Sequence, residues 1–315
     1  MPFVDRTIEF LGHVDLERTR LRRPRSTVFV CGGKTDSDPT QAHSVRDLIL
    51  KGLPDRTKID ATSIILAEVA KDALADSHFD NLLDMEECIA AVVDAVLLVV
   101  ESPGSVCELG AFTKTAEIRR KLVAIVPNKY ANAPSFITLG PVKFIEGIED
   151  GGVVEPVPWD PDVIPITIDL LARNAIIDEY KTQVARNFSK REFVDQTSLG
   201  HTIFIVLAIC HILRGPKLGE IKSCLNTLGF DIPDGTIRKY IDTLEVCGLL
   251  NTVRYTKKRI HYVPRTDRVV LEFGYKAGTP DADRNTLRWL DRIKDEIEAE
   301  EAERLTIFQE HNDAA

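Results

Sequence analysis

A carboxylate nucleophile is the chemistry that the stretch Glu101–Phe112 could carry. Its sequence is ESPGSVCELGAF, and it directly follows the apolar run Ala95–Val100. The Pro-Gly pair indicates a turn, Ser105 is a candidate helix N-cap, and Glu108 then falls in the first helical turn. A helix N-terminus favours an ionised carboxylate, which a nucleophile requires. A structural interpretation stays open, because Ser105-x-x-Glu108 also matches a capping box that only closes the start of the helix.

Two glycines follow the first predicted strand and could bring the backbone close to a ligand. Thr27–Val30 ends at Cys31-Gly32-Gly33, where glycine permits a tight turn with N–H groups against a phosphate or ribose. No complete dinucleotide or P-loop motif is present, so a turn without ligand contact is an equally good interpretation. A thiol mechanism through Cys107 is rejected, because no histidine accompanies it. The further candidate substrate contacts, each of which could equally be structural, are Glu86, Glu101, Ser102, Gly104, Ser105 and Phe136.

Apolar patterns predict the elements that position these residues. Short continuous apolar runs are typical of strands buried on both faces of a parallel sheet, and Ala95–Val100 and Leu122–Val126 are such runs. Strands that alternate with helices predict a doubly wound α/β sheet, with ligands beyond the carboxyl ends of the strands. The other predicted elements are a helix at His43–Leu50, a strand at Ile59–Leu66 and a helix at Phe79–Val93.

The C-terminal half has the order of a winged helix-turn-helix domain. Helices are predicted at Thr202–Leu213, Leu218–Leu228 and Asp234–Leu250, and a hairpin at Val253–Val263. The third helix is in the recognition position. Contact with a protein stays an alternative to contact with nucleic acid. The candidate phosphate-binding residues are Arg238, Lys239, Arg254, Lys257, Lys258 and Arg259.

The charge distribution supports this division. The net charge of −9 combines −10 over residues 1–180, +7 over 181–276 and −6 over 277–315. A basic segment between two acidic ones indicates contact with a polyanion. The predicted organisation is an N-terminal flanking or partner-docking segment at 1–25, a catalytic domain at 26–160, a helical linker at 161–198, the winged helix at 199–276 and a charged helix at 277–315.

The amino-acid composition excludes disordered, collagen-like and coiled-coil proteins. The chain is 44% apolar and 28% charged, which is ordinary for a globular protein. Its six cysteines form no C-x-x-C pair, and disulfide frameworks and metal sites are therefore not expected. No apolar run reaches the length of a membrane span, and the Arg-rich N-terminus does not match a signal peptide. We expect a cytoplasmic protein without membrane contact.

The pattern Gly104-x-x-x-Glu108-x-Gly110 after a buried strand resembles the nucleophile motif of nucleoside 2-deoxyribosyltransferases. The N-glycosidase effectors of type II retron antiphage systems are more similar still. The matching blocks occur in the same order between about residues 26 and 145: Val28–Gly33, Glu101–Ser105, Glu108–Phe112, Arg119–Leu122, Ser135–Ile137 and Gly140–Val142.

This resemblance implies a deoxyribosyltransferase-like, flavodoxin-like catalytic domain and a toxic effector. Such effectors cleave NAD to nicotinamide and ADP-ribose, so NAD is a substrate and no cofactor is implied. Glu108 would attack the anomeric carbon, and water would hydrolyse the glycosyl-enzyme, as in retaining glycosidases. The resemblance also implies a winged helix and control by a retron reverse transcriptase with its branched RNA–DNA product, the msDNA.

One departure from the family bears on the substrate. The transferases place an aspartate six residues before the nucleophile, where this chain has Ser102, with Glu101 one position earlier. Loss of an acid there would harm a neutral purine leaving group more than a cationic nicotinamide, which favours NAD over a plain nucleoside. Two alternative functions stay open. The chain could be a nucleoside or nucleotide deoxyribosyltransferase or hydrolase that uses the same site, or a DNA-binding regulator that senses a nucleotide. A homo- or higher-order oligomer is also possible.

Overall fold

The computed structural model describes residues 3–36, 42–53, 55, 57–59, 62–131, 134–147, 152–159, 170–188, 191–256, 259–266, 269–280, 284–286, 288–289 and 302–312. The chain divides into two compact units. The sheet unit consists of Arg25–Ala75 and Asn81–Lys190, and the helical unit of Met1–Pro24, Asp76–Asp80 and Arg191–Ala315. Among the described helices, none is both long and apolar enough to cross a membrane.

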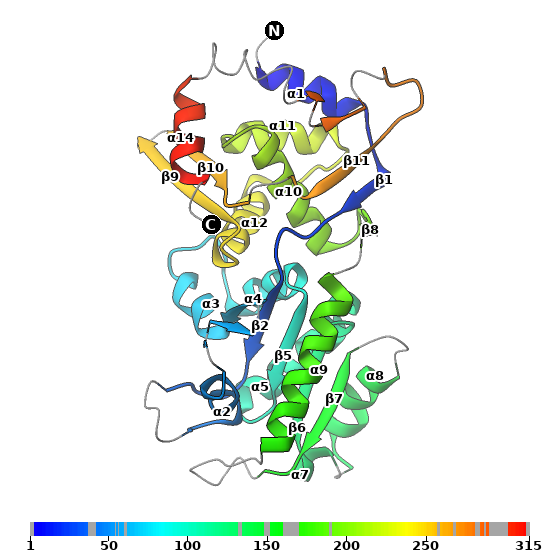
Figure 1. Ribbon diagram of the computed structural model, residues 1–315, viewed down its shortest axis with the longest axis vertical. Helices are drawn as coiled ribbons and strands as arrows, with labels where there is room; N and C mark the ends of the chain where they lie inside the picture. The colour runs from blue at the N-terminus through cyan, green and yellow to red at the C-terminus, as the bar shows by residue number, and fades with distance from the viewer. Residues whose placement is uncertain are drawn as a thin grey trace. The chain divides into compact units, whose positions relative to one another are not determined.

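The sheet unit is built on six strands in the order β3-β4-β2-β5-β6-β7 (Figure 1). All neighbouring pairs are parallel except β3 and β4. The parallel strands therefore follow the 2-1-3-4-5 order of a flavodoxin-like doubly wound sheet, with the reversal of order between β2 and β5. The strands are β2 (Thr27–Cys31), β3 (Lys58–Ile59), β4 (Thr62–Leu66), β5 (Ala95–Val99), β6 (Leu122–Pro127) and β7 (Val153–Val157).

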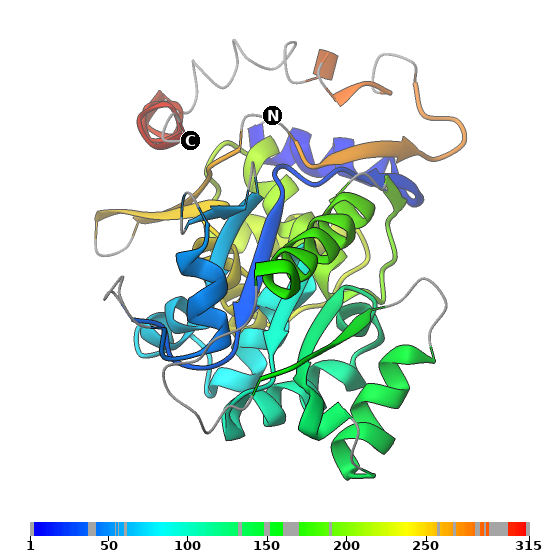
Figure 2. The same cartoon turned by 60° about the horizontal axis from the view of Figure 1, so that its bottom comes forward.

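Helices cover both faces of this sheet (Figures 1 and 2). On one face, Val28, Leu97 and Ile125 share a core with α2 and α9. Successive strand residues point to opposite faces, so Phe29 meets the ring of Phe112 on the other face, with centroids 6.5 Å apart. The helices are α2 (Val45–Lys51), α3 (Ala67–Leu74), α4 (Leu82–Val92), α5 (Pro103–Lys114), α6 (Ala116–Arg119), α7 (Asn128–Ala131), the π-helix η1 (Thr138–Val142), α8 (Lys143–Glu146) and α9 (Leu170–Phe188).

The continuous apolar runs are the buried parallel strands that the sequence predicts. Every residue of β5 and β6 is buried, since helices pack against both faces. The predicted strand at residues 59–66 is wrong in extent, because Ile59 pairs antiparallel with Thr62 and the chain reverses direction within the run. The single predicted strand is thus β3 followed by β4.

The helical linker predicted at residues 161–198 is also corrected. Ile176, Tyr180 and Val184 of α9 are buried in the core beneath the sheet, and Asn187 Nδ2 donates to the backbone oxygen of Asp94 at 2.6 Å. Burial of these apolar side chains makes α9 part of the sheet unit. Residues 161–169 lie outside the described residues, and residues 192–193 form strand β8 of the helical unit.

The helical unit contains three helices and a hairpin in the predicted order. Helix α10 is buried along nearly its whole length, and α11 and α12 pack against it. These elements confirm the predicted helices and hairpin. The third helix is shorter than predicted, because it ends at Val246 and Leu250 already belongs to strand β9. The elements are α10 (Leu199–Ile212), α11 (Leu218–Thr227), α12 (Asp234–Val246), β9 (Leu250–Thr256) and β10 (Arg259–Pro264).

The N-terminal residues belong to this unit and are not a separate flanking segment. They form α1 (Phe3–Gly12) and β1 (Val14–Leu21), and β1 is the central strand between β8 (Glu192–Phe193) and β11 (Leu271–Tyr275). Phe10 stacks on Trp289 with ring centroids 4.4 Å apart. Burial of this aromatic pair fixes the N-terminus to the C-terminal part of the chain.

The predicted C-terminal charged helix is seen only in part. Helix α14 (Ala302–Asn312) packs through Ile307 and Phe308 on Val263 of the hairpin. Its buried Arg304 donates to Glu220 Oε1 of α11 at 2.6 Å. Residues 290–301 of the predicted helix lie outside the described residues.

Candidate active site

The turn after β2 is shaped by the backbone around it. Gly32 has a positive φ of 147°, and a Cβ at this position would come within 3.0 Å of Val99 Cβ. A Cβ on Gly33 would lie 2.9 Å from Glu101 Cδ. Close packing therefore explains glycine at both positions. The predicted contacts of Cys31, Gly32 and Gly33 with a substrate stay predictions.

Glu101 joins this turn to the start of α2. Its Oε1 accepts hydrogen bonds from Gly33 N at 2.9 Å and Arg46 N at 3.2 Å, and its Oε2 accepts one from Val45 N at 2.6 Å. Burial raises the pKa of Glu101, while these three donors act against that rise. Both oxygens accept hydrogen bonds from the backbone, and the predicted contact of Glu101 with a substrate stays a prediction.

The start of α5 differs from the sequence prediction, and Glu108 is not part of the helix cap. Ser102, not Ser105, is the N-cap, and these two serines form the capping box with each other. Ser102 Oγ accepts from Ser105 N at 3.2 Å, and Ser105 Oγ accepts from Ser102 N at 2.9 Å. Glu108 therefore lies in the second turn and takes no part in capping. Gly104 is exposed at the beginning of the helix.

Glu108 is half-buried with one oxygen free of hydrogen bonds. Among the described residues, no donor reaches its buried Oε2. Burial raises the pKa of Glu108; the guanidinium of Arg46 lowers it and the carboxylate of Glu68 raises it. Cys107, next to it, is exposed. An unengaged carboxylate oxygen is what a nucleophile must present.

Glu86 of α4 supplies a second carboxyl group, which interacts electrostatically with Glu108. It is only 4% exposed, and burial, together with the charges of Glu108 and Glu68, raises its pKa from 4.5 to about 8. Glu86 is thus largely protonated at neutral pH. Two coupled carboxyls in which one keeps its proton are the usual arrangement of an acid and a nucleophile. Burial, followed by the charges of Glu108 and Glu86, also raises the pKa of the Cys31 thiol, which keeps it protonated.

Arg46 and Glu68 complete this cluster, and the sequence did not point to either. Arg46 Nη1 donates to Glu68 Oε2 at 3.1 Å, and Nη2 bonds to the other oxygen. Arg46 Nε also donates to Gly33 O at 2.7 Å and Nη1 to Val30 O at 3.2 Å. A charged residue on a short helix is normally solvated, so only the close helix–sheet packing reveals this guanidinium as a buried one. In the described part of the chain, no group of three or more His, Cys, Asp or Glu side chains is placed to hold a metal ion.

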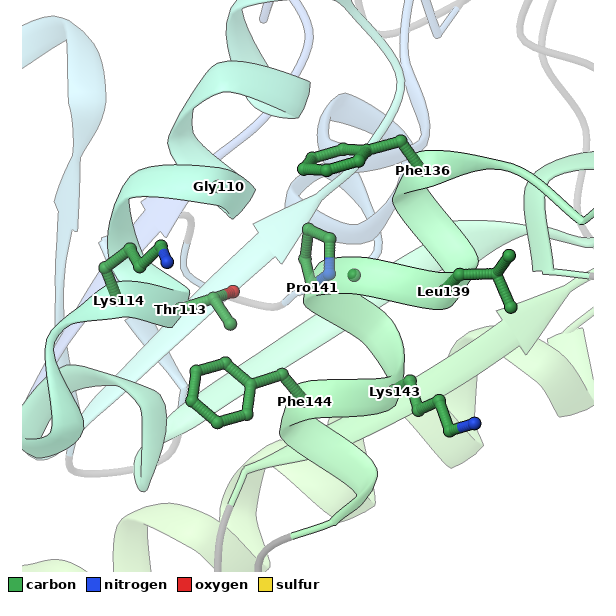
Figure 3. A pocket seen from close by; sticks show the side chains of 9 residues that line it. Gly110, Thr113, Lys114, Phe136, Leu139, Pro141, Lys143 and Phe144 are labelled. Atoms are coloured by element: carbon green, nitrogen blue, oxygen red, sulfur yellow. The ribbon is translucent and has the colours of Figure 1, made fainter.

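Phe136 lines a pocket that is separate from Glu108, although residues of α5 contribute to both. The pocket has a volume of about 500 Å³, and Figure 3 shows residues of α5 on one side and Phe136, Pro141 and Phe144 on the other. Its α5 residues follow Glu108 by two, five and six positions, or about 140–240° around the helix axis. They therefore lie on the side of α5 opposite Glu108. Phe136 is 85% exposed, and its predicted stacking on a base stays a prediction. The α5 residues that line the pocket are Gly110, Thr113 and Lys114.

The predicted nucleic-acid contacts lie on α12 and the hairpin. Arg238 and Lys239 are on α12, and Arg254 is exposed on β9. Lys239 is already engaged, since its Nζ lies 2.9 Å from Asp80 Oδ2. Lys257 and Lys258 lie outside the described residues, as does the side chain of Arg259.

Two curated proteins of Escherichia coli are similar to this chain. They are the retron Ec86 putative ribosyltransferase/DNA-binding protein, 32% identical over 128 residues, and the retron Ec73 putative ribosyltransferase/DNA-binding protein, 34% identical over 137 residues. Each match covers 41% of this chain, and 40% and 42% of the two relatives. The chain therefore matches less than half of the length of either relative.

A protein-family model gives a longer match. The model describes the STM3845 retron effector protein and matches residues 42–254, which include α2, Glu86, Glu108 and the three helices of the helical unit. This is more than half of the chain. The match shows that the chain belongs to the STM3845 family of retron effector proteins.

Proposed function

We propose that the sheet unit is an N-glycosidase that cleaves NAD, with Glu108 as nucleophile. One observation carries the role of Glu108: no described donor engages one of its carboxylate oxygens, which leaves the lone pairs of that oxygen for attack on a carbon atom. The two relatives are named putative ribosyltransferases, which supports glycosyl transfer as the class of reaction. The position beside the β2–β5 reversal is where doubly wound sheets bind ligands.

The first step forms a bond between a Glu108 oxygen and the anomeric carbon of the ribose. The glycosidic C–N bond breaks, and its electron pair passes to the pyridinium nitrogen, so nicotinamide leaves as a neutral molecule without needing a proton. Water then attacks the same carbon, displaces the Glu108 carboxylate and releases ADP-ribose and one proton. Arg46 stabilises the ionised form of Glu108 that begins the cycle.

A nucleoside or nucleotide is the second candidate substrate, and Glu86 favours it. A neutral base leaves poorly as an anion, so its nitrogen must be protonated as the C–N bond breaks. Protonated Glu86 can supply that proton and, as a carboxylate, take one back from the attacking water. The sequence argument for NAD relied on a missing acid at Ser102, and Glu86 provides an acid from another helix.

The helical unit is proposed to be a winged helix that contacts the retron reverse transcriptase and its msDNA. Helices α10, α11 and α12 followed by the β9–β10 hairpin have the order of that fold. The relatives are named DNA-binding proteins as well. In this proposal the chain is the toxic effector of an antiphage system, and the partner complex holds it inactive. Co-expression with that complex should therefore suppress nicotinamide release.

The enzyme is tested by incubating the purified chain with NAD and following free nicotinamide. Glu108→Gln should lower the rate on the order of 10³-fold or more, because amide oxygen is a poor nucleophile. Glu146→Gln makes the same change at an exposed residue of α8 and should leave the rate unchanged. Release by both wild type and Glu108→Gln would contradict Glu108 as nucleophile.

The same assay with nucleosides and nucleotides separates the two substrates. Base release that depends on Glu108, without nicotinamide release from NAD, would replace NAD by the second candidate. Absence of release from every substrate would contradict an enzymatic function of the isolated chain.

A further inference from the structure

The segment Asp76–Asp80 lies between α3 and α4 in the sequence but packs with the helical unit. Its contacts with α12 are specific. Asp80 Oδ2 lies 2.9 Å from Lys239 Nζ, and the same ammonium lies 5.6 Å from the ring centroid of Phe79. His78 donates its backbone N–H to Asp242 Oδ2 at 2.6 Å, and its ring Nδ1 lies 3.0 Å from the same oxygen. We call this segment the clasp.

The clasp occupies a basic residue of the predicted recognition helix. The Asp80 side chain is 84% exposed, while that of Lys239 is 26% exposed. The side-chain hydrogen bond and the charge of Lys239 lower the pKa of Asp80, so it is an anion at neutral pH. Exposed ion pairs are weak and are screened by salt. A phosphate oxygen has the charge and geometry to take the place of the Asp80 carboxylate on Lys239.

The clasp also connects α3 and α4, two helices that contribute to the group of charged residues around Glu108. We call this group, which consists of Arg46, Glu68, Glu86 and Glu108, the acid cluster. Helix α3 carries Glu68 and ends at Leu74, and α4 begins at Leu82 and carries Glu86. Only seven residues separate the two helices along the chain. The two helices also pack against each other. Release of the clasp from α12 therefore acts on the ends of both helices, which hold the carboxyl groups next to Glu108.

We propose that the clasp is a regulatory contact in which nucleic-acid phosphate and Asp80 compete for Lys239. The inference rests on the proposed function for its catalytic consequence, but not for the competition itself. With the clasp closed, the Glu86–Glu108 pair is assembled. Nucleic acid bound at Lys239 releases the clasp, loosens α3 and α4, and lowers the N-glycosidase rate.

Binding of a labelled DNA duplex at low salt tests the competition directly. Asp80→Asn removes the competing charge and should tighten binding severalfold. Asp76→Asn is the matched control, since it makes the same change on an exposed residue of the same segment. Lys239→Gln should weaken binding and reduce the slope of log affinity against log salt by about 0.9.

Hydrogen exchange provides a readout that does not depend on catalysis. Saturating the wild-type chain with the duplex should speed exchange of amides in α3 and α4, and Lys239→Gln should abolish that response. Equal affinities for Asp80→Asn and Asp76→Asn, no binding of the duplex, or unchanged exchange in α3 and α4 would each overturn the proposal. If the exchange response occurs but no substrate is cleaved, the failure lies with the proposed enzyme and not with the clasp.

Discussion

Arg46 and Glu86 of the sheet unit are buried, whereas the ion pair between Lys239 and Asp80 in the helical unit is in contact with solvent. Arg46 is 1% exposed and Glu86 is 4% exposed, while Lys239 pairs with an aspartate that is largely exposed. Burial strengthens electrostatic interactions and raises the cost of an unpaired charge, and solvent weakens them at the surface. The buried cluster is therefore suited to hold groups in fixed protonation states. The surface pair is suited to exchange one anion for another.

The sharpest test of this comparison is Glu86→Gln. Glutamine cannot donate a proton, so the release of a neutral base should fall by about 10²–10⁴-fold. For the wild type, the rate of neutral-base release should decline as the pH rises through about 8, because Glu86 then loses its proton. Initial rates across pH 6 to 10 measure both effects. A pH profile unchanged by the substitution would exclude Glu86 as the acid.

The raised pKa of Glu86 also predicts that the free energy of unfolding depends on pH. Burial, followed by the charge of Glu108, raises the pKa of Glu86 from 4.5 in the reference state to about 8 in the folded protein. The stability it contributes is therefore fully present below pH 4.5 and is lost as the pH rises to about 8. Urea denaturation should show the free energy of unfolding falling more steeply over this range in wild type than in Glu86→Gln. Parallel curves would indicate an ordinary carboxyl group.

A smaller effect is expected from breaking the ion pairs of the two regions. Arg46→Met should lower the free energy of unfolding by about 3 kcal/mol, because it removes the donors to the buried carbonyl oxygens of Gly33 and Val30. Arg46→Lys keeps the charge and should lose less. Asp80→Asn should leave thermal denaturation unchanged, since its pair is exposed. Equal losses for Arg46→Met and Asp80→Asn would break the comparison.

The smallest effect is expected from Phe136→Ala. The side chain is 85% exposed at a pocket on the side of α5 opposite Glu108. Its loss should therefore change neither thermal denaturation nor the kcat and KM of base release. An increase in KM alone would instead support the predicted stacking of Phe136 on a base.

Local patterns in the sequence predict the elements well. Each buried strand is a continuous apolar run, and each helix around α10 shows an apolar period, because neighbouring residues alone determine these patterns. Glu108 is also found locally, from its place after a buried strand and a Pro-Gly turn. Errors arise where tertiary packing decides, as for α9, whose apolar stripe is compatible with either a linker or a core helix.

The sequence by itself determined the alternation of strands and helices, the position of Glu108 on a helix after β5, and the order of helices and hairpin in the C-terminal half. Only the tertiary structure decided that Glu101 binds backbone N–H groups, that Arg46 and Glu68 enter the acid cluster, and that Asp80 engages Lys239. The physical reason is sequence separation. These contacts join residues 22 to 159 positions apart, and a charged side chain carries no local mark of whether folding will bury it or which partner it will meet.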